Sequence, residues 1–247
     1  MDRSWLRIAH RGASAAAPEL KRAAILRAPD IGGDMIEVDV QLTGDGHPVV
    51  MHDETLERTT NGTGLVRERT WEEIRDLDAG SWFAPAFAGE RPLDLDGLLD
   101  LVGDRARLNV EIKAGLADAD VLIPLLLDRL AAAGQAERAI ISCFDLEMLA
   151  RVRAASSTAA LGVLWFMPEV DDALAAVDRL GAVALHPYVR TASDEMFSEA
   201  RRRGIATHVW TVNDVPTMQR LVEVGASGIM TDHPEVFASV DARAAGA

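Results

Sequence analysis

Short hydrophobic stretches of strand length alternate with amphipathic stretches of helical period along most of the chain. The helical stretches include residues 118–133, 170–180, 193–203 and 215–224. The hydrophobic stretches end near His10, Asp39, Lys113, Ser142, Leu164, Leu185, Trp210 and Thr231. Alternation of this kind builds a parallel sheet with helical crossovers. Eight repeats in 247 residues predict an α/β protein with a closed (β/α)8 TIM barrel.

An open, doubly wound sheet is the structural alternative to a barrel. A glycine-rich phosphate loop after the first strand, of the form GxGxxG, would favour the open sheet. The first strand is followed here by His10-Arg11-Gly12-Ala13-Ser14, which matches neither that motif nor a Walker loop. The closed barrel is therefore the fold that the pattern favours.

Residues 54–91 interrupt the alternation of strands and helices. They hold a stretch rich in Thr and Gly at 59–64 and one short helical piece near 70–77. The segment is long for a simple loop and small for an independent domain. We expect a single barrel domain over residues 1–247, with 54–91 as a small insertion after the second strand that packs on one end of the barrel.

Composition and charge restrict the partners of this protein. The net charge is −14 and the one run of three basic residues is 201–203, so nucleic acid and anionic membrane surfaces are poor candidates. The single cysteine, Cys143, excludes an internal disulfide and is expected to be buried. Charges at the start of the chain argue against a signal peptide, and no apolar run approaches a membrane span. We expect a cytoplasmic protein with a small-molecule substrate; a homo-oligomer stays open.

Charged residues lie inside two of the predicted strands. Glu37 and Asp39 are two positions apart, and so are Glu111 and Lys113, which places each pair on one face of its strand. Because all strands of a barrel open their carboxyl ends on one face, these pairs are expected to meet there. Solvated strand residues and a structural ion pair at the barrel end are the alternatives to a functional site.

The residue types at these strand ends suit phosphate chemistry. Three acids beside one lysine leave an excess of negative charge, which a partly buried site tolerates when a cation neutralises it. Oxygen ligands favour Mg²⁺ or Ca²⁺ over zinc. Arg11 and Lys113 could bind a phosphate group. His10 and His52 have side chains whose pKa lies near working pH, so they could form an acid and base pair.

Motifs along almost the whole chain resemble, in order, those of the glycerophosphodiester phosphodiesterases. The matching motifs are His10-Arg11-Gly12, Pro18-Glu19, Glu37-x-Asp39, Asp45-Gly46, Val49-Val50-x-His52-Asp53, Arg58-Thr59-Thr60-x-Gly62, Glu111-Ile112-Lys113, Trp210-Thr211-Val212-Asn213 and Thr231-Asp232-x-Pro234-Glu235. Each motif is weak by itself, but nine in sequence order with close spacing are specific.

The resemblance implies a fold, a reaction and a metal. The implied fold is a (β/α)8 barrel with a small insertion after strand two, in agreement with the strand count. The implied reaction is the cleavage of a glycerophosphodiester to sn-glycerol 3-phosphate and an alcohol. One divalent cation, Mg²⁺ or Ca²⁺, would be held by Glu37, Asp39 and Glu111.

The resemblance also implies roles for the remaining candidate residues. His10 and His52 would be the acid and base catalysts, and Arg11 and Lys113 would bind the phosphate. Trp210 would lie against the glycerol end of the substrate.

Two residues depart from the family pattern in the first loop. The family usually has Asn after the Pro-Glu pair, often followed by Thr, whereas this chain has Leu20 and Lys21. Leu20 cannot replace the side-chain hydrogen bonds of Asn. Lys21 is expected on an exposed face of a helix that opens at Pro18-Glu19.

Two alternative functions stay open. The first is a lysophospholipase-D-like phosphodiesterase with a lipid substrate, for which an apolar pocket mouth would be needed; the candidate lining residues are Trp82, Phe83, Phe87, Trp165 and Phe166. The second is a barrel that binds a phosphodiester without turning it over, and Leu20 is the feature that supports it.

Overall fold

The computed structural model describes residues 5–113 and 115–244. Within these residues, ten strands form one sheet. Eight of those described strands run parallel and close into a barrel, because β1 pairs with both β2 and β10. The barrel strands are β1 (Leu6–His10), β2 (Met35–Leu42), β5 (Arg107–Ile112), β6 (Ile140–Cys143), β7 (Ala160–Trp165), β8 (Ala184–Pro187), β9 (Ala206–Val209) and β10 (Gly228–Thr231). The predicted (β/α)8 barrel is therefore confirmed.

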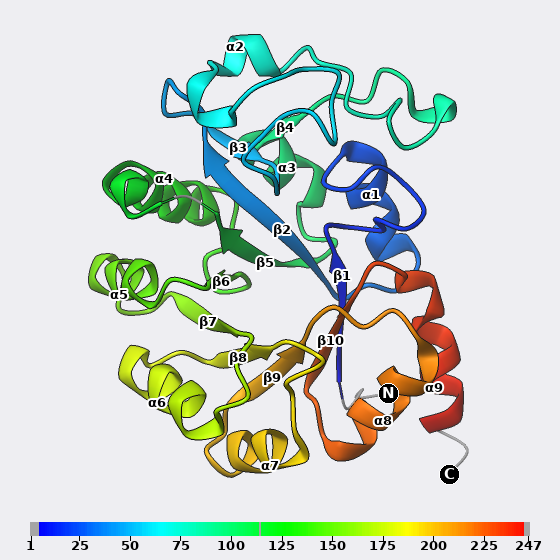
Figure 1. Ribbon diagram of the computed structural model, residues 1–247, viewed down its shortest axis with the longest axis vertical. Coiled ribbons are helices and arrows are strands. Elements are labelled where there is room, and N and C mark those ends of the chain that lie inside the picture. The colour runs from blue at the N-terminus through cyan, green and yellow to red at the C-terminus, as the bar shows by residue number, and fades with distance from the viewer. Residues whose placement is uncertain (1–4, 114, 245–247) are drawn as a thin grey trace.

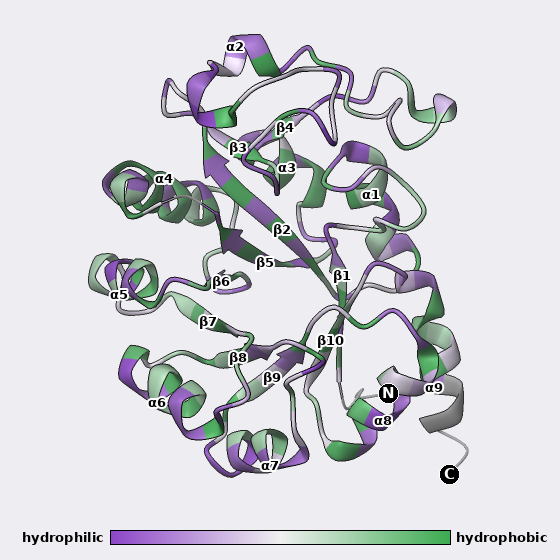
Figure 2. Ribbon diagram, in the orientation of Figure 1, coloured by the Kyte–Doolittle hydropathy of each residue, from purple (hydrophilic) through white to green (hydrophobic). Residues whose placement is uncertain are grey.

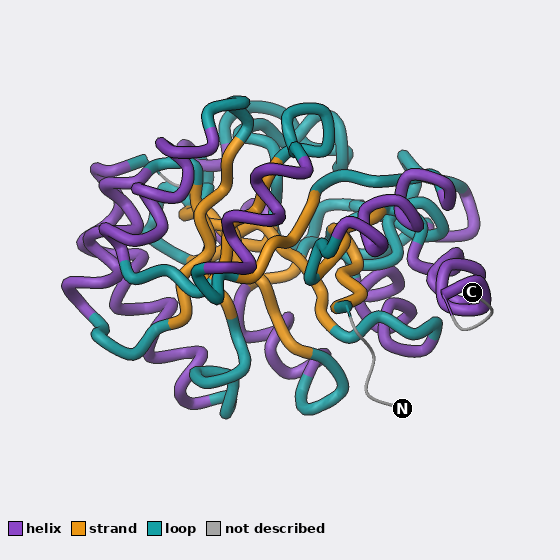
Figure 3. The backbone as a smooth tube through the Cα atoms, turned by 90° about the horizontal axis from the view of Figure 1, so that it is seen from below, coloured by secondary structure: helices purple, strands orange, loops and turns teal. Residues whose placement is uncertain are grey.

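Helices surround the barrel and connect its strands (Figure 1). They are α1 (Arg22–Asp30), α3 (Leu95–Val102), α4 (Ala119–Ala132), α5 (Leu146–Ala155), α6 (Val170–Leu180), α7 (Asp194–Arg202), α8 (Val215–Val224) and α9 (Phe237–Ala244). Figure 3 shows the strands in the middle of the molecule with helices on the outside. None of the helices in the described part of the chain is long and apolar enough to cross a membrane.

Side chains at the helix ends explain why several helices begin and end where they do. Asp145, Ser193 and Asp214 accept hydrogen bonds from backbone N–H groups in the first turns of α5, α7 and α8. Gly181 and Gly225 adopt left-handed conformations directly after α6 and α8, which glycine does without steric cost. These local signals are readable in the sequence, and α6 and α8 have the predicted bounds.

Strand β2 shows how the barrel separates its two faces. Hydrophobic and hydrophilic residues alternate along it in Figure 2, although every residue of the strand is buried. Ile36, Val38 and Val40 belong to the main core, in which strands pack against helices. Because successive strand residues point to opposite faces, Glu37 and Asp39 point into the barrel. The polar alternation of this buried strand is therefore what delivers carboxylates to the barrel interior.

Helix α1 begins later than the sequence predicts. Leu20 has a φ of 58°, in the left-handed region, and its N–H donates to the carbonyl oxygen of Arg11 at 3.0 Å. This backbone geometry keeps residues 18–20 out of the helix, which starts at Arg22. Lys21 precedes the helix and is 1% exposed, and burial lowers its pKa to about 8. The expectation that Lys21 lies on an exposed helix face is therefore wrong.

A hairpin follows β2 and returns the chain to the same end of the barrel. Strand β3 (Pro48–Val50) pairs antiparallel with β2, with Val40 opposite Val50, and it continues to pair with the short β4 (Leu93–Asp94). The N–H of Met51 donates to the carbonyl oxygen of Asp39 at 3.1 Å. The hairpin thereby brings the residues after β3 level with the acidic end of β2.

The segment between β3 and β4 includes the residues predicted to form an insertion. It holds η1 (Val66–Glu68), α2 (Trp71–Ile74) and η2 (Pro85–Phe87), at the top of Figure 1. A small apolar cluster joins it to β3; its buried members are Val49, Met51, Leu56, Val66 and Ile74. Helix α2 begins with a reciprocal cap, because the Thr70 side chain accepts from the Glu73 N–H and Glu73 accepts from the Thr70 N–H.

Candidate active site

Three carboxylates from β2 and β5 meet inside the barrel. One oxygen from each of Glu37, Asp39 and Glu111 lies within 4.8 Å of the others, and all three residues are buried. The pairing of β2 with β5 places Asp39 opposite Glu111. The structure therefore brings together the three acids that the sequence predicts as a cluster.

Burial and mutual repulsion make this cluster costly without a cation. Burial, reinforced by the charges of Asp39 and Glu111, raises the pKa of Glu37 well above its ordinary value. Burial and the charge of Asp39 raise the pKa of Glu111 to about 7. Glu37 Oε1 and both side-chain oxygens of Asp39 have no hydrogen-bond partner among the described residues. Such oxygens could accept a hard divalent cation, which takes oxygen ligands.

Arg11 and Lys113 lie on either side of Asp39. Arg11 Nε is 3.3 Å from Asp39 Oδ2, while Lys113 Nζ is 3.4 Å from Asp39 Oδ1 and 2.6 Å from Glu111 Oε1. Burial would lower the pKa of both cations, but the surrounding carboxylates outweigh it and raise both values. Two permanent positive charges therefore adjoin the acids, which suits an anionic ligand.

His10 is held by an acid at the far end of the chain. Its Nδ1 lies 2.6 Å from Asp232 Oδ1, and its Nε2 lies 3.8 Å from Glu37 Oε2. Asp232 also accepts hydrogen bonds from Ser14 Oγ and Asn213 Nδ2. Burial would raise the pKa of Asp232, but the hydrogen bond with His10 and the other contacts lower it to about 2. An ionised Asp232 favours the tautomer with the proton on Nδ1, which leaves Nε2 facing the acidic cluster.

His52 also has a carboxylate partner. Its Nδ1 lies 2.7 Å from Asp53 Oδ1. Burial lowers the pKa of His52, and the charges of Asp39, Arg11 and Lys113 all act on its ring. Both predicted histidines therefore pair Nδ1 with a carboxylate and keep Nε2 available for proton transfer.

Trp210 adds an aromatic side chain to the site. With His10, Glu37 and Glu111 it lines a small cavity above the barrel interior. Its Nε1 donates to the carbonyl oxygen of His186 at 2.7 Å, and its ring centroid lies 5.5 Å from that of Phe144. The aromatic side chains therefore adjoin the charged ones, and Lys113 Nζ lies 5.9 Å from the centroid of the Phe144 ring.

A charged cluster at the carboxyl face of a barrel is compatible with many enzymes, and sequence comparison decides among them. A model of the glycerophosphoryl diester phosphodiesterase family matches residues 10–236. The chain belongs to this family. The resemblance read from the sequence motifs is thus confirmed, and the match covers all the candidate residues described above.

Members of the family resemble this chain over nearly their whole length. A glycerophosphodiester phosphodiesterase of Caldanaerobacter subterraneus subsp. tengcongensis is 41% identical over 93% of this chain and 95% of the relative. One from Bacillus subtilis is 34% identical over 95% of this chain and 86% of the relative. Among solved structures, an Oleispira antarctica phosphodiesterase in complex with the product sn-glycerol-3-phosphate matches with a TM-score of 0.91 at 27% identity, covering 96% of each chain.

Several contacts within this glycerophosphoryl diester phosphodiesterase site were not predicted. The sequence motifs contain Asp232, Glu19 and Arg58, but no role was assigned to any of them. Asp232 directly follows β10, at the same barrel end as the other site residues, and that position was the available signal. The partners of Glu19 and Arg58 lie on separate loops, so no local pattern indicates them.

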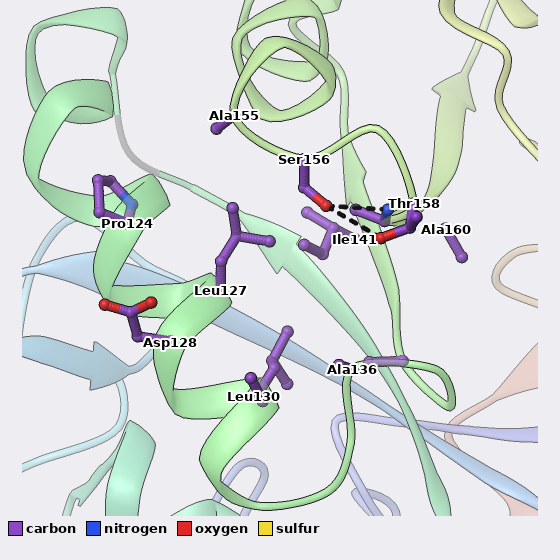
Figure 4. A pocket seen from close by; sticks show the side chains of 13 residues that line it. Pro124, Leu127, Asp128, Leu130, Ala136, Ile141, Ala155, Ser156, Thr158 and Ala160 are labelled. Atoms are coloured by element: carbon purple, nitrogen blue, oxygen red, sulfur yellow. Dashed lines mark hydrogen bonds between the residues drawn. The ribbon is translucent and has the colours of Figure 1, made fainter.

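A larger hollow in the molecule lies elsewhere. A groove of about 550 Å³ runs between α4 and α5 at the amino ends of β6 and β7 (Figure 4). Leu127 and Leu130 of α4 face Ala155, Ser156 and the following loop across it. Its lining is mainly apolar and includes none of the family motif residues, so the size of a hollow does not locate the chemistry here.

Proposed function

We propose that this protein hydrolyses glycerophosphodiesters to sn-glycerol 3-phosphate and an alcohol, as a cytoplasmic enzyme acting on small dissolved substrates. The family membership supports the reaction class. The observation that carries the proposal is the buried acidic cluster with a cation on each side of Asp39 and a carboxylate-paired histidine at each flank. This combination provides for a metal, a phosphate and two proton carriers in one site.

We assign Glu37, Asp39 and Glu111 as the residues that would hold one divalent cation, Mg²⁺ or Ca²⁺. The buried oxygens of Glu37 and Asp39 that accept no hydrogen bond, together with the all-oxygen donor set, support that fit. A bound cation would offset the charge of the phosphodiester and lower the pKa of a hydroxyl group or water beside it.

Arg11 and Lys113 would bind the phosphate oxygens. Arg11 can donate from two nitrogens to one phosphate, and Lys113 supplies a compact charge. As charge gathers on these oxygens during the reaction, the two cations stabilise it more strongly than they stabilise the substrate. Trp210 would pack against the glycerol end, because its ring presents an apolar wall to the same small cavity.

His10 and His52 would carry the protons. One Nε2 accepts a proton from the attacking water as the new phosphorus–oxygen bond forms; where a hydroxyl group of the substrate attacks instead, water must then open the resulting cyclic phosphate to give glycerol phosphate. The other histidine, which must carry a proton on both ring nitrogens, donates the Nε2 proton to the oxygen of the departing alcohol as its bond to phosphorus breaks. Asp232 and Asp53 each accept from Nδ1–H of one ring, which leaves Nε2 free to accept a proton in one histidine and to donate one in the other.

The deciding assay detects glycerol 3-phosphate released from a panel of glycerophosphodiesters by the purified full chain. We expect release with glycerophosphocholine or a related diester, loss of activity in EDTA, and recovery when Mg²⁺ or Ca²⁺ is added back. Ligand-induced thermal stabilisation with no release from any diester would instead identify a non-catalytic phosphodiester-binding barrel.

A lipid substrate is the second candidate, and an exposed apolar rim favours it. Phe144, Phe166 and Met167 are 39%, 56% and 43% exposed. Phe144 packs against both Trp210 and Phe166, so the rim continues from the aromatic wall of the site. A lysophospholipase-D-like enzyme would prefer lysophosphatidylcholine to glycerophosphocholine, and Phe166→Ser would reduce that preference. Equal loss on both substrates would argue against a lipid-binding rim.

A further inference from the structure

Arg58 connects two carboxylates that belong to different parts of the site. Its Nε and NH2 donate to Asp53 at 2.5 and 2.9 Å. Its NH1 and NH2 donate to Glu19 at 2.8 and 2.7 Å. One guanidinium group thus makes a two-pronged contact with each acid. Asp53 follows β3, Glu19 lies in the loop after β1, and Arg58 belongs to the segment between β3 and β4.

Each of these carboxylates contacts a residue of the proposed chemistry. Asp53 pairs with Nδ1 of His52 at 2.7 Å. Glu19 Oε1 accepts from Arg11 NH1 at 3.0 Å. A continuous chain of charged contacts therefore runs from His52 through Arg58 to Arg11, with Arg58 at its centre.

Hydrogen bonds and apolar packing hold the backbone turn that carries Arg58. The N–H and the hydroxyl of Thr60 both bind the carbonyl oxygen of Leu56, at 3.1 and 2.7 Å. Leu56 and Thr60 are 2% and 6% exposed, so this turn is anchored in the apolar cluster under the segment. Arg58 therefore projects onto the site from a rigid base.

The geometry distinguishes Arg58 from an ordinary surface ion pair. An isolated exposed pair contributes little to stability and is readily broken by water and salt. Arg58 is 42% exposed at its side chain, but its Glu19 partner is only 13% exposed, and four charge-assisted hydrogen bonds fix the plane of the guanidinium group. A lysine, as a point charge on a flexible stem, could not form both two-pronged contacts.

We propose that Arg58 is a positioning residue that aligns His52 through Asp53 and Arg11 through Glu19. The inference rests on the proposed function, in which His52 transfers a proton and Arg11 binds phosphate. A single side chain then orients both the proposed proton carrier His52 and the proposed phosphate-binding residue Arg11. The loop that carries it begins immediately after His52 and Asp53, and so takes part in catalysis without touching the substrate.

The proposal predicts a particular division of kinetic effects. Asp53→Asn should lower kcat by about 10- to 100-fold with little change in KM, because a misplaced proton carrier slows chemistry. Glu19→Gln should mainly raise KM, because Arg11 loses its anchor. Arg58→Gln should do both. In the Asp53→Asn background, Arg58→Gln should change KM only, because the contact to His52 is already lost. In the Glu19→Gln background, it should change kcat only.

Two further variants separate positioning from charge. Arg58→Lys keeps the positive charge but cannot make a two-pronged contact with each carboxylate, so its kinetics should resemble those of Arg58→Gln. Guanidinium ion at millimolar concentration should restore part of the lost rate to Arg58→Ala. Arg75→Gln is the matched control: Arg75 lies in the same segment and pairs with the exposed Glu72 at 2.9 Å, so its removal should leave kcat and KM unchanged.

A measurement that does not depend on activity keeps the two proposals distinct. In ¹⁵N NMR spectra of the full chain, the His52 ring should show one tautomer, protonated at Nδ1, and a mixture in Arg58→Gln. An unchanged His52 tautomer, additive double variants, or full activity of Arg58→Lys would overturn the positioning role.

If the wild-type chain releases no glycerol phosphate, the proposed function fails, and the tautomer still decides whether Arg58 aligns His52. If Arg58→Gln does not fold, Arg58→Lys with the Asp53 and Glu19 variants decides the question.

Discussion

His10 and Asp232 stand 222 positions apart in the chain, and His10 Nδ1 lies 2.6 Å from Asp232 Oδ1. Their contact exists because β1 and β10 are neighbours in the closed barrel, with Ala9 opposite Thr231. The barrel closure that joins the two ends of the sheet thus also completes the pairing of a proposed catalytic histidine.

Asp232→Asn should lower kcat more than it changes KM. The amide can no longer accept the Nδ1–H as a charged partner, so the imidazole loses its preferred tautomer and orientation. We expect a loss of about 10- to 100-fold in kcat, in line with other losses of a group that orients a catalytic residue. Release of glycerol 3-phosphate measures it, with Asp171→Asn at the start of α6 as control. A purely structural role would instead lower the melting temperature and leave the rate at ordinary temperature intact.

His10→Ala and His52→Ala should each reduce kcat by about 10²–10⁴-fold, because each removes a proton carrier. The far-ultraviolet circular dichroism spectrum should stay that of the wild type, since both rings lie at the barrel mouth and not in the apolar core. His233→Ala is the control, because the ring of His233 is exposed and contacts Glu235. Near-wild-type rates in either test variant would remove that histidine from the mechanism.

Metal binding should be visible as thermal stabilisation. A cation that binds the folded state at 100 times its Kd adds about 2.7 kcal/mol to the free energy of unfolding. After EDTA treatment, the melting temperature of the wild-type protein should therefore rise on addition of Mg²⁺ or Ca²⁺. The melting temperature of Glu37→Gln should rise far less. In EDTA itself, Glu37→Gln should melt no lower than wild type, because it removes a buried charge with an unpaired oxygen. Equal gains in both proteins would place the cation elsewhere.

A buried pair of histidines should make the free energy of unfolding decrease as the pH falls. His208 Nδ1 lies 3.2 Å from His186 Nε2, and both rings are buried in the barrel. Burial lowers the pKa of His208 to about 4 and that of His186 well below its ordinary value. Between pH 6.5 and 4 the unfolded chain therefore binds protons that the folded chain does not, so the free energy of unfolding decreases as the pH falls. For His208 the full loss is about 3 kcal/mol.

Denaturant unfolding of wild type and His208→Gln, each at pH 7 and pH 5, tests this dependence. Burial raises the pKa values of Glu37 and Glu111, so these acids act in the opposite direction and stabilise the fold as the pH falls. The difference between the two proteins cancels that contribution. We expect wild type to lose more stability than His208→Gln between the two pH values; parallel losses would contradict a neutral buried pair.

The sequence predicts the barrel and the central acids because both are local patterns. Glu37, Asp39 and Glu111 interrupt hydrophobic strands, and a carboxylate inside a strand is conspicuous without any structure. The predicted start of α1 and the predicted exposure of Lys21 were wrong because Leu20 adopts a left-handed backbone conformation, which leucine rarely does.

The remaining parts of the site depend on long-range contacts. Asp232 acquires its role from the closure of the barrel, and Arg58 acquires its role from two loops folded over one another. Their motifs are visible in the chain, but a motif does not say which distant side chain it contacts. The sequence therefore indicated the residues proposed to act on the substrate better than the residues proposed to hold them in place.

The hairpin of β2 and β3 has a consequence for how this enzyme could be redesigned. It returns the chain to the level of Asp39 and delivers His52 before the segment between β3 and β4 begins. Residues 75–91 contribute no buried member to the apolar cluster under the Arg58 turn, so a loop grafted there from a relative should leave the carboxylates, the histidines and that turn in place. This end of the barrel can therefore diversify in sequence without disturbing the residues proposed to cleave the substrate.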